Sequence, residues 1–216
     1  MEQVRKTMAE EMRYTTVRRE AHASFEEKKS EFIGHVKPVS TEAEALAFLS
    51  EIRAKYPDAT HNVYAYVLRE NNTARYSDDR EPQGTAGMPV LDVLRKSEIQ
   101  DVIVVVTRYF GGTLLGTGGL VRAYTQAAKM ALDEGEIVVR ARLAILSVEC
   151  SYTDYQKLLP TLSTPEIRIE NTDFTDRVTV HLATLAEEAD GLRHRLTELS
   201  GGRVIFTDEG ERFDYL

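Results

Sequence analysis

The stretch from Asp101 to Ala131 constrains the fold more than any other part of this chain. It begins as a β-branched apolar run, DVIVVVT, passes through the pairs Gly111-Gly112 and Gly118-Gly119, and continues as an amphipathic helical pattern. Glycine is used where φ must be positive or where two backbones approach closely. Two Gly-Gly pairs within nine residues therefore predict a shaped loop at the end of a buried strand, where α/β folds place many ligand sites.

This glycine loop has two interpretations. Its backbone N–H groups and the following helix N-terminus could bind an anion such as phosphate, with Arg108 and Arg122 adding charge. Alternatively, the glycines only permit a tight strand-to-helix connection. Neither the Gly-Lys-Ser/Thr of the P-loop nor the G-x-G-x-x-G of dinucleotide binders is present. The binding residues predicted in this run are Arg108, Tyr109, Gly111, Gly112, Gly116, Gly118, Gly119 and Arg122.

The segment from Ser77 to Gly87, SDDREPQGTAG, is the second candidate. Its three carboxylates, Asp78, Asp79 and Glu81, could hold a divalent metal or supply an acid–base pair. The EF-hand spacing is absent, and aspartates are common in turns for local hydrogen-bonding reasons. A recognition or turn-fixing role is therefore favoured, with Asp78 and Asp79 kept as weak catalytic candidates. The binding residues predicted here are Ser77, Glu81, Gly84 and Thr85.

Histidine and cysteine offer little for metal chemistry. The five histidines show no H-x-x-x-H or H-E-x-x-H spacing, so a zinc site is not expected. His61, which starts a strand, is a weak catalytic candidate whose alternative is a structural hydrogen bond. The chain has a single cysteine, Cys150, which excludes an internal disulfide. Because Cys150 lies in an apolar, strand-like run, we expect a buried, inert thiol. We expect neither a metal nor a cofactor.

The hydrophobic pattern predicts two α+β domains. Residues 1–13 are expected to be a flexible terminus, residues 14–140 the first domain and residues 141–216 the second, with an exposed basic joint at 140–142. In the second domain the pattern β-α-β-β-α-β indicates a ferredoxin-like arrangement. In the first we expect two strands in 14–39, helices over 41–54 and 120–132, strands over 62–69 and 101–107, and a turn-rich segment over 71–87.

Charge separates the two domains. The net charge is −8, but residues 143–216 carry 7 Lys and Arg against 14 Asp and Glu, a net charge of −7. A nucleic-acid clamp needs a basic surface, so any anion-binding cleft is expected in the first domain. The acidic second domain instead favours a basic protein partner. No apolar segment long enough for a membrane span or signal peptide is present, which predicts a cytoplasmic protein without membrane contact.

Short sequence blocks stand out along residues 29–124: Lys29-Ser30, Phe32-Ile33, ATHN at 59–62, SDD at 77–79, Glu81-Pro82, GTAG at 84–87, RYFGG at 108–112 and LGTGGLVRAY at 115–124. Together these blocks resemble the IMPACT/YigZ family, and the resemblance covers essentially the whole chain. The sequence departs from the family pattern at Glu31, where a basic residue is usual, and at Arg80, where glycine is usual.

The resemblance implies a first domain with the fold of ribonuclease PH and of the second domain of a ribosomal protein, and a second domain like domain V of elongation factor G. Eukaryotic members are linked to translational control. The resemblance therefore implies a non-enzymatic RNA- or ribosome-associated regulator that binds an anionic ligand in the glycine-loop cleft. The alternatives are an enzyme acting on a phosphorylated small molecule or nucleic-acid end, and a protein-binding adaptor.

Overall fold

The computed structural model describes residues 13–215, which form two compact units. The N-terminal unit comprises residues 15–138, and the C-terminal unit comprises the described residues from 139 onward together with Arg13 and Tyr14. The division therefore assigns Tyr14, Val139 and Arg140 to the C-terminal unit, whereas the sequence pattern placed them in the first domain. Of the expected flexible terminus, residues 1–12 lie outside the described residues, and Arg13 begins strand β1 (Arg13–Val17).

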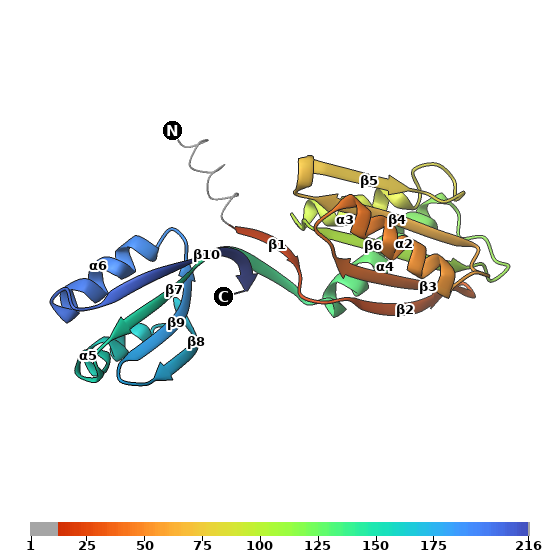
Figure 1. The fold of residues 1–216 in the computed structure, drawn as a ribbon. Coiled ribbons are helices and arrows are strands. Elements are labelled where there is room, and N and C mark those ends of the chain that lie inside the picture. Colours follow the sequence, from red (N-terminus) through yellow and green to blue (C-terminus); the bar gives the residue numbers. More distant parts are fainter. Residues whose placement is uncertain (1–12, 216) are drawn as a thin grey trace. The chain divides into compact units, whose positions relative to one another are not determined.

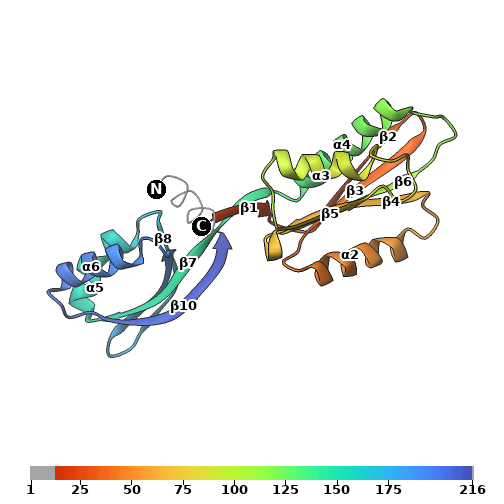
Figure 2. The same cartoon turned by 90° about the horizontal axis from the view of Figure 1, so that it is seen from above.

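The N-terminal unit is a five-stranded antiparallel sheet in the order β2-β3-β6-β4-β5. Helix α2 covers one face of the sheet, and α3 and α4 cover the other (Figure 2). The elements are β2 (Ala21–Glu27), β3 (Ser30–Pro38), α2 (Glu42–Lys55), β4 (His61–Leu68), η1 (Glu70–Asn72), β5 (Thr73–Ser77), α3 (Gly87–Lys96), β6 (Val102–Tyr109) and α4 (Thr117–Glu134).

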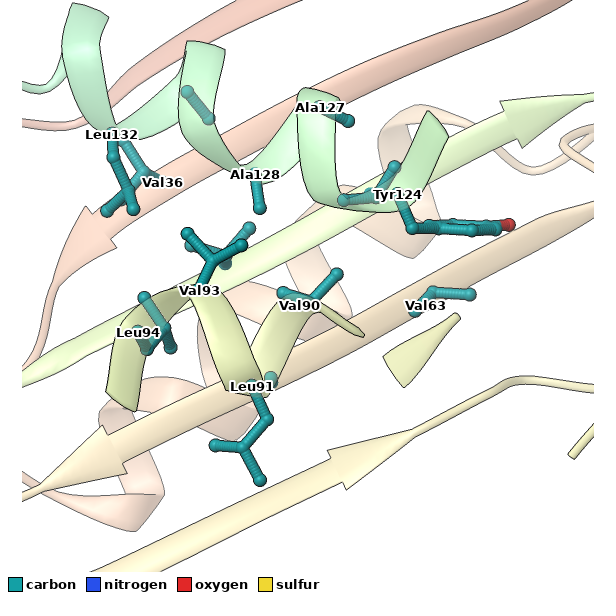
Figure 3. Packing of buried hydrophobic residues seen from close by; sticks show 14 of the residues in the cluster. Val36, Val63, Val90, Leu91, Val93, Leu94, Tyr124, Ala127, Ala128 and Leu132 are labelled. Carbon is teal, nitrogen blue, oxygen red and sulfur yellow. The ribbon is translucent and has the colours of Figure 1, made fainter. Parts of the chain in front are cut away.

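Strand β6 lies in the middle of this sheet, as its unbroken apolar run predicts. Alternate residues of β6 contribute to two hydrophobic cores, one under α2 and one under α3 and α4. In the second core, Tyr124, Ala128 and Leu132 of α4 belong to the same buried cluster as Val93 and Leu94 of α3 (Figure 3). Burial of each large apolar side chain of this kind stabilises the fold by about 1.5–3 kcal/mol.

Helix α2 begins as its sequence predicts. The Thr41 hydroxyl accepts a hydrogen bond from the Glu44 N–H at 3.2 Å, and the Glu44 carboxylate accepts one from the Ser40 N–H at 2.6 Å. These contacts satisfy N–H groups that have no partner within the helix. The helix then buries Phe48 and Ile52 against the sheet.

Three sequence expectations about secondary structure are wrong. Residues 14–39 contain three strands rather than two, because the chain also turns between β1 and β2. The segment 71–87, expected to consist of turns, contains β5, whose backbone pairs with β4 from Tyr64 to Leu68. The expected exposed joint at 140–142 is part of the continuous strand β7 (Ile137–Cys150), where Ala141 is buried. There β7 pairs with β10 (Ile205–Tyr215) in an antiparallel ladder.

The C-terminal unit has the element order β7-α5-β8-β9-α6-β10, the predicted βαββαβ pattern (Figure 1). Its antiparallel strands lie in the order β10-β7-β9-β8, and β1 also pairs with β7. The helices bury Leu158, Leu192 and Leu196 against the sheet, and Cys150 is buried in the same core, as predicted. The remaining elements are α5 (Tyr152–Leu162), β8 (Ile167–Phe174), β9 (Val178–Leu185), α6 (Ala189–Ser200) and β10 (Ile205–Tyr215).

None of the helices described in residues 13–215 is long and apolar enough to cross a membrane.

Candidate functional site

Arg108 and Glu81, two of the predicted binding residues, pair with each other inside the N-terminal unit. Arg108 Nη1 donates to Glu81 Oε1 at 2.5 Å, and the two side chains are only 5% and 4% exposed. The Tyr124 hydroxyl donates to the same carboxylate oxygen at 2.7 Å, and Arg108 Nη2 donates to the Ser30 hydroxyl at 3.3 Å. Burial, and then the adjacent Glu81 carboxylate, raise the pKa of Tyr124, so its hydroxyl remains a donor.

Asp78 shapes the segment that leads into α3. One carboxylate oxygen accepts from the Gly84 N–H at 2.8 Å, and the other accepts from the N–H groups of Ala86 at 3.1 Å and Gly87 at 2.8 Å. These bonds satisfy backbone donors at the start of the helix. The Thr85 hydroxyl donates to the Pro82 carbonyl at 2.6 Å, and the Ser77 hydroxyl accepts from the Asp79 N–H at 3.2 Å.

Asp79 connects this segment to β4. Its carboxylate accepts from the Asn62 N–H at 2.6 Å, and its carbonyl accepts from His61 Nδ1 at 2.7 Å. Because a carbonyl oxygen can only accept a hydrogen bond, Nδ1 of His61 carries a proton. The other ring nitrogen of His61, Nε2, lies 3.7 Å from Glu81 Oε1. Asp79 and Arg80 have φ values of 40° and 72°. The turn therefore keeps the left-handed backbone that glycine favours, although Arg80 stands there.

The weak catalytic candidates thus make mainly backbone contacts. Asp78 binds three N–H groups, and Asp79 and His61 hold β4 to the turn. These are the contacts of the turn-fixing role. Within residues 13–215, no group of three or more His, Cys, Asp and Glu side chains is placed to hold a metal ion.

The glycine loop connects β6 to α4, and its glycines have different structural roles. A Cβ at Gly111 would lie 1.8 Å from the Lys29 carbonyl oxygen, so only glycine fits against the β2–β3 turn. Gly112 and Gly116 have φ values of 83° and 73°. Gly118 lies in the first turn of α4 with an ordinary φ, and a Cβ there would meet only Arg122 Nη1, at 3.9 Å, beyond the backbone of its own helix. A shaped loop at the end of a buried strand is therefore present.

The loop presents apolar side chains to solvent. Phe110 is 45% exposed and Leu114 is 81% exposed. The Arg108 guanidinium lies 5.5 Å from the centroid of the Phe110 ring, and the Thr60 hydroxyl accepts from the Phe110 N–H at 3.1 Å. The side chain of Tyr109 points to the other face of β6 from that of Arg108, and its hydroxyl donates to the Asp58 carboxylate at 2.9 Å. Phe110 is thus held in place while its ring remains accessible.

A small cavity of about 150 Å³, lined by two cations, Lys28 and Arg122, and one carboxylate, Glu27, adjoins the loop at Leu115. Lys28 comes from the β2–β3 turn, and Gly119 and Arg122 come from the first turns of α4. Of the two arginines predicted to bind an anion, Arg122 lines this cavity, whereas Arg108 lies in the interior. We call Phe110, Leu114, Lys28, Gly119 and Arg122 together the glycine-loop surface.

The sequence interpretation missed two contributors to this region. The Tyr124 hydroxyl donates to Glu81, a contact between residues 43 positions apart that no local pattern indicates. The approach of Lys28 to α4 depends on the pairing of β2 with β3. In the sequence, the aromatic residue Phe110 close to Arg108 is the feature that could have predicted the exposed part of the glycine-loop surface.

Comparison with known proteins relates both units to one family. The family description "Impact N-terminal domain" matches residues 28–132, and "Domain of unknown function (DUF1949)" matches residues 148–203. A crystal structure described as that of a hypothetical protein is 30% identical, covers 92% of this chain and 99% of its own, and superposes with a TM-score of 0.59.

The two bacterial relatives extend over nearly the same length, whereas the eukaryotic one matches a smaller part. IMPACT family member YvyE of Bacillus subtilis is 36% identical over 191 residues, 88% of each chain. IMPACT family member YigZ of Escherichia coli is 34% identical over 180 residues, 82% of this chain and 88% of its own. The Protein IMPACT homolog of Dictyostelium discoideum is 39% identical over 98 residues, 43% of this chain and 28% of its own. The chain belongs to the IMPACT family.

Proposed function

We propose that this protein is an RNA- or ribosome-associated regulator whose N-terminal unit binds single-stranded RNA on the glycine-loop surface. The observation that carries the proposal is the exposure of Phe110 and Leu114 in a loop whose Leu115 lines the same cavity as Lys28 and Arg122. Sites for single-stranded nucleic acid combine cations that follow the phosphates with aromatic rings on which bases stack. Burial of Phe110 against a base would also remove its exposed apolar area from water.

The position of charge supports the same unit. The excess of acidic residues falls after residue 142, so the long-range field of the C-terminal unit repels phosphates. The link of eukaryotic family members to translational control supports the regulatory part of the proposal. We further infer that the N-terminal unit shares the fold of ribonuclease PH and the second domain of a ribosomal protein. The βαββαβ order of the other unit agrees with an inferred likeness to domain V of elongation factor G.

An enzymatic role has less support. The carboxylates of Asp78 and Asp79 already accept hydrogen bonds from backbone N–H groups, so a catalytic role would require these bonds to break.

Fluorescence anisotropy with a labelled oligouridine, together with co-sedimentation with ribosomes, tests the proposal. Loss of one base–aromatic stack costs about 1–3 kcal/mol, so Phe110→Ala should weaken RNA binding roughly 5- to 150-fold. Leu46→Ala, which removes an exposed apolar side chain from α2 on the other side of the sheet, is the control and should bind as the unaltered protein does. Absence of both RNA binding and ribosome co-sedimentation would refute the proposal.

A further inference from the structure

Three aromatic rings form a solvent-exposed cluster on the C-terminal unit. Tyr152 and Tyr155 come from the first turn of α5, and Phe174 ends β8. The Phe174 ring centroid lies 6.3 Å from that of Tyr152 and 5.7 Å from that of Tyr155. Phe174 is nevertheless 57% exposed and Tyr152 48% exposed. We call these three residues the aromatic corner.

The aromatic corner is held in a defined position. The Tyr152 hydroxyl donates to the Thr175 carbonyl at 2.7 Å, which ties the start of α5 to the β8–β9 turn. Tyr155 packs partly against the core of the unit, so it anchors the base of the cluster. Single exposed apolar residues are ordinary, but contacting rings that stay exposed are typical of a binding surface. Because the cluster is already fixed, these side chains would lose little conformational freedom when a partner binds.

The charges around the corner favour a cationic partner. Asp176, in the turn after β8, is exposed two residues beyond Phe174. Asp173 points to the opposite face of β8 from Phe174, where its carboxylate lies 3.3 Å from His181 Nε2. The basic side chains of this region already have carboxylate partners: Arg177 lies 2.9 Å from Glu149, and Lys157 lies 3.6 Å from Asp154. With the net charge of −7 over residues 143–216, a phosphate-bearing ligand would meet repulsion here.

We propose that the aromatic corner binds an arginine-bearing segment of a basic protein. A guanidinium stacks on the exposed faces of Phe174 and Tyr152, where the ring quadrupole attracts a cation. Its N–H groups, or those of a neighbouring arginine, then donate to Asp176. Arginine fits better than lysine because its planar group stacks on a ring and donates from its edge at the same time. This proposal concerns a different unit from the RNA proposal and does not depend on it.

Isothermal titration of the full chain with a synthetic peptide of alternating arginine and glycine tests this inference. Phe174→Ala should weaken peptide binding at least tenfold, and a peptide with lysine in place of arginine should bind more weakly to the unaltered protein. Asp176→Asn should weaken binding and reduce its dependence on salt. Leu199→Ala, which removes an exposed side chain of α6, is the control and should leave binding unchanged. Circular dichroism verifies that each variant is folded.

Three results would overturn the proposal. Equal peptide affinities of the unaltered protein and Phe174→Ala would show that attraction to the acidic unit is nonspecific. Binding of oligouridine that depends on Phe174 would identify the corner as a nucleic-acid surface. A dimer in sedimentation velocity that Phe174→Ala abolishes would show that a second copy of the chain occupies it.

Discussion

Arg108 and Glu81 form an ion pair of 2.5 Å in the interior of the N-terminal unit, directly behind the exposed ring of Phe110. The pair fixes the position of the C-terminal end of β6, and Phe110 is the first residue after this strand. Tyr124 and Ser30 supply the further hydrogen bonds that a buried ion pair requires. The interior pair and the exposed ring therefore have separate tasks, one structural and one available for binding.

Removal of the Glu81 charge should destabilise the protein strongly. Glu81→Gln leaves Arg108 as an uncompensated buried charge, and loss of one partner of a buried pair costs about 3–5 kcal/mol. Urea unfolding measures the change. Asp190→Asn, which breaks an exposed pair with Arg193, is the control and should cost less than about 1 kcal/mol. A loss below about 1 kcal/mol for Glu81→Gln as well would contradict the structural role of the pair.

Substitution by alanine should have opposite effects on the free energy of unfolding at Gly111 and at Gly118. Gly111→Ala forces a Cβ against the Lys29 carbonyl oxygen and should destabilise the fold by more than about 2 kcal/mol through backbone displacement. Gly118→Ala adds a better helix former where there is space, and should raise the free energy of unfolding by up to about 1 kcal/mol. Thermal unfolding of both variants is the measurement, and similar losses would show that the loop geometry is incorrectly described.

Arg80 occupies a left-handed backbone position that is costly for any residue with a Cβ. The left-handed conformation costs roughly 1–2 kcal/mol for an L-residue, and glycine avoids this cost. Glycine loses more backbone entropy on folding, which offsets part of the gain, so Arg80→Gly should stabilise the protein by about 1 kcal/mol. Arg80→Ala retains the Cβ but loses the contact with the Thr60 carbonyl, so it should give no stabilisation. Chemical unfolding distinguishes these results, and equal behaviour of the two variants would show that the side chain rather than the backbone governs this position.

His35 should make the protein less stable in acid. Burial, followed by the charges of His22 and Lys55, lowers its pKa from 6.5 to about 4. Between these values the unfolded chain binds more protons than the native chain, so stability falls as the pH drops from 6.5 toward 4 and changes no further below it. The loss is about 3 kcal/mol for this shift.

His35→Leu should flatten that part of the pH profile, and Nε2 of His35 has no hydrogen-bond partner to lose among the described residues. His194→Gln changes an exposed histidine of α6 and serves as the control, with an unaltered profile expected. Urea unfolding at a series of pH values gives the comparison. A profile of His35→Leu that is as steep as that of the unaltered protein would place the acid sensitivity elsewhere.

The elements with strong local signals could be predicted from the sequence. The apolar run of β6 and the Thr41 cap of α2 are examples, because both depend on residues close together in the chain. Strand β5 could not, since its polar sequence TARYS takes its structure from pairing with β4. The expected joint was wrong for a related reason: Arg140 and Arg142 of β7 pair with a strand at the end of the chain.

The candidate site shows the same limit. The glycine loop is visible in the sequence because positive φ and close approach demand a particular residue. The burial of Arg108 is not visible, because its partner Glu81 lies 27 positions away and Tyr124 lies 43 positions beyond Glu81. An arginine beside glycines suggests a solvent-facing ligand group, and only the tertiary contacts assign this one to the interior.

The salt dependence of oligouridine binding tests the central proposal most directly. If Lys28 and Arg122 contact phosphates, Lys28→Gln with Arg122→Gln should make the slope of log K against log salt less steep by about 1.4, since each contact with a single strand contributes about 0.7. Lys96→Gln with Lys129→Gln removes the same charge from a groove between α3 and α4 and is the matched control. A reduced slope for the first variant alone is the result that we predict. An equal slope for all three proteins would contradict RNA binding at the glycine-loop surface.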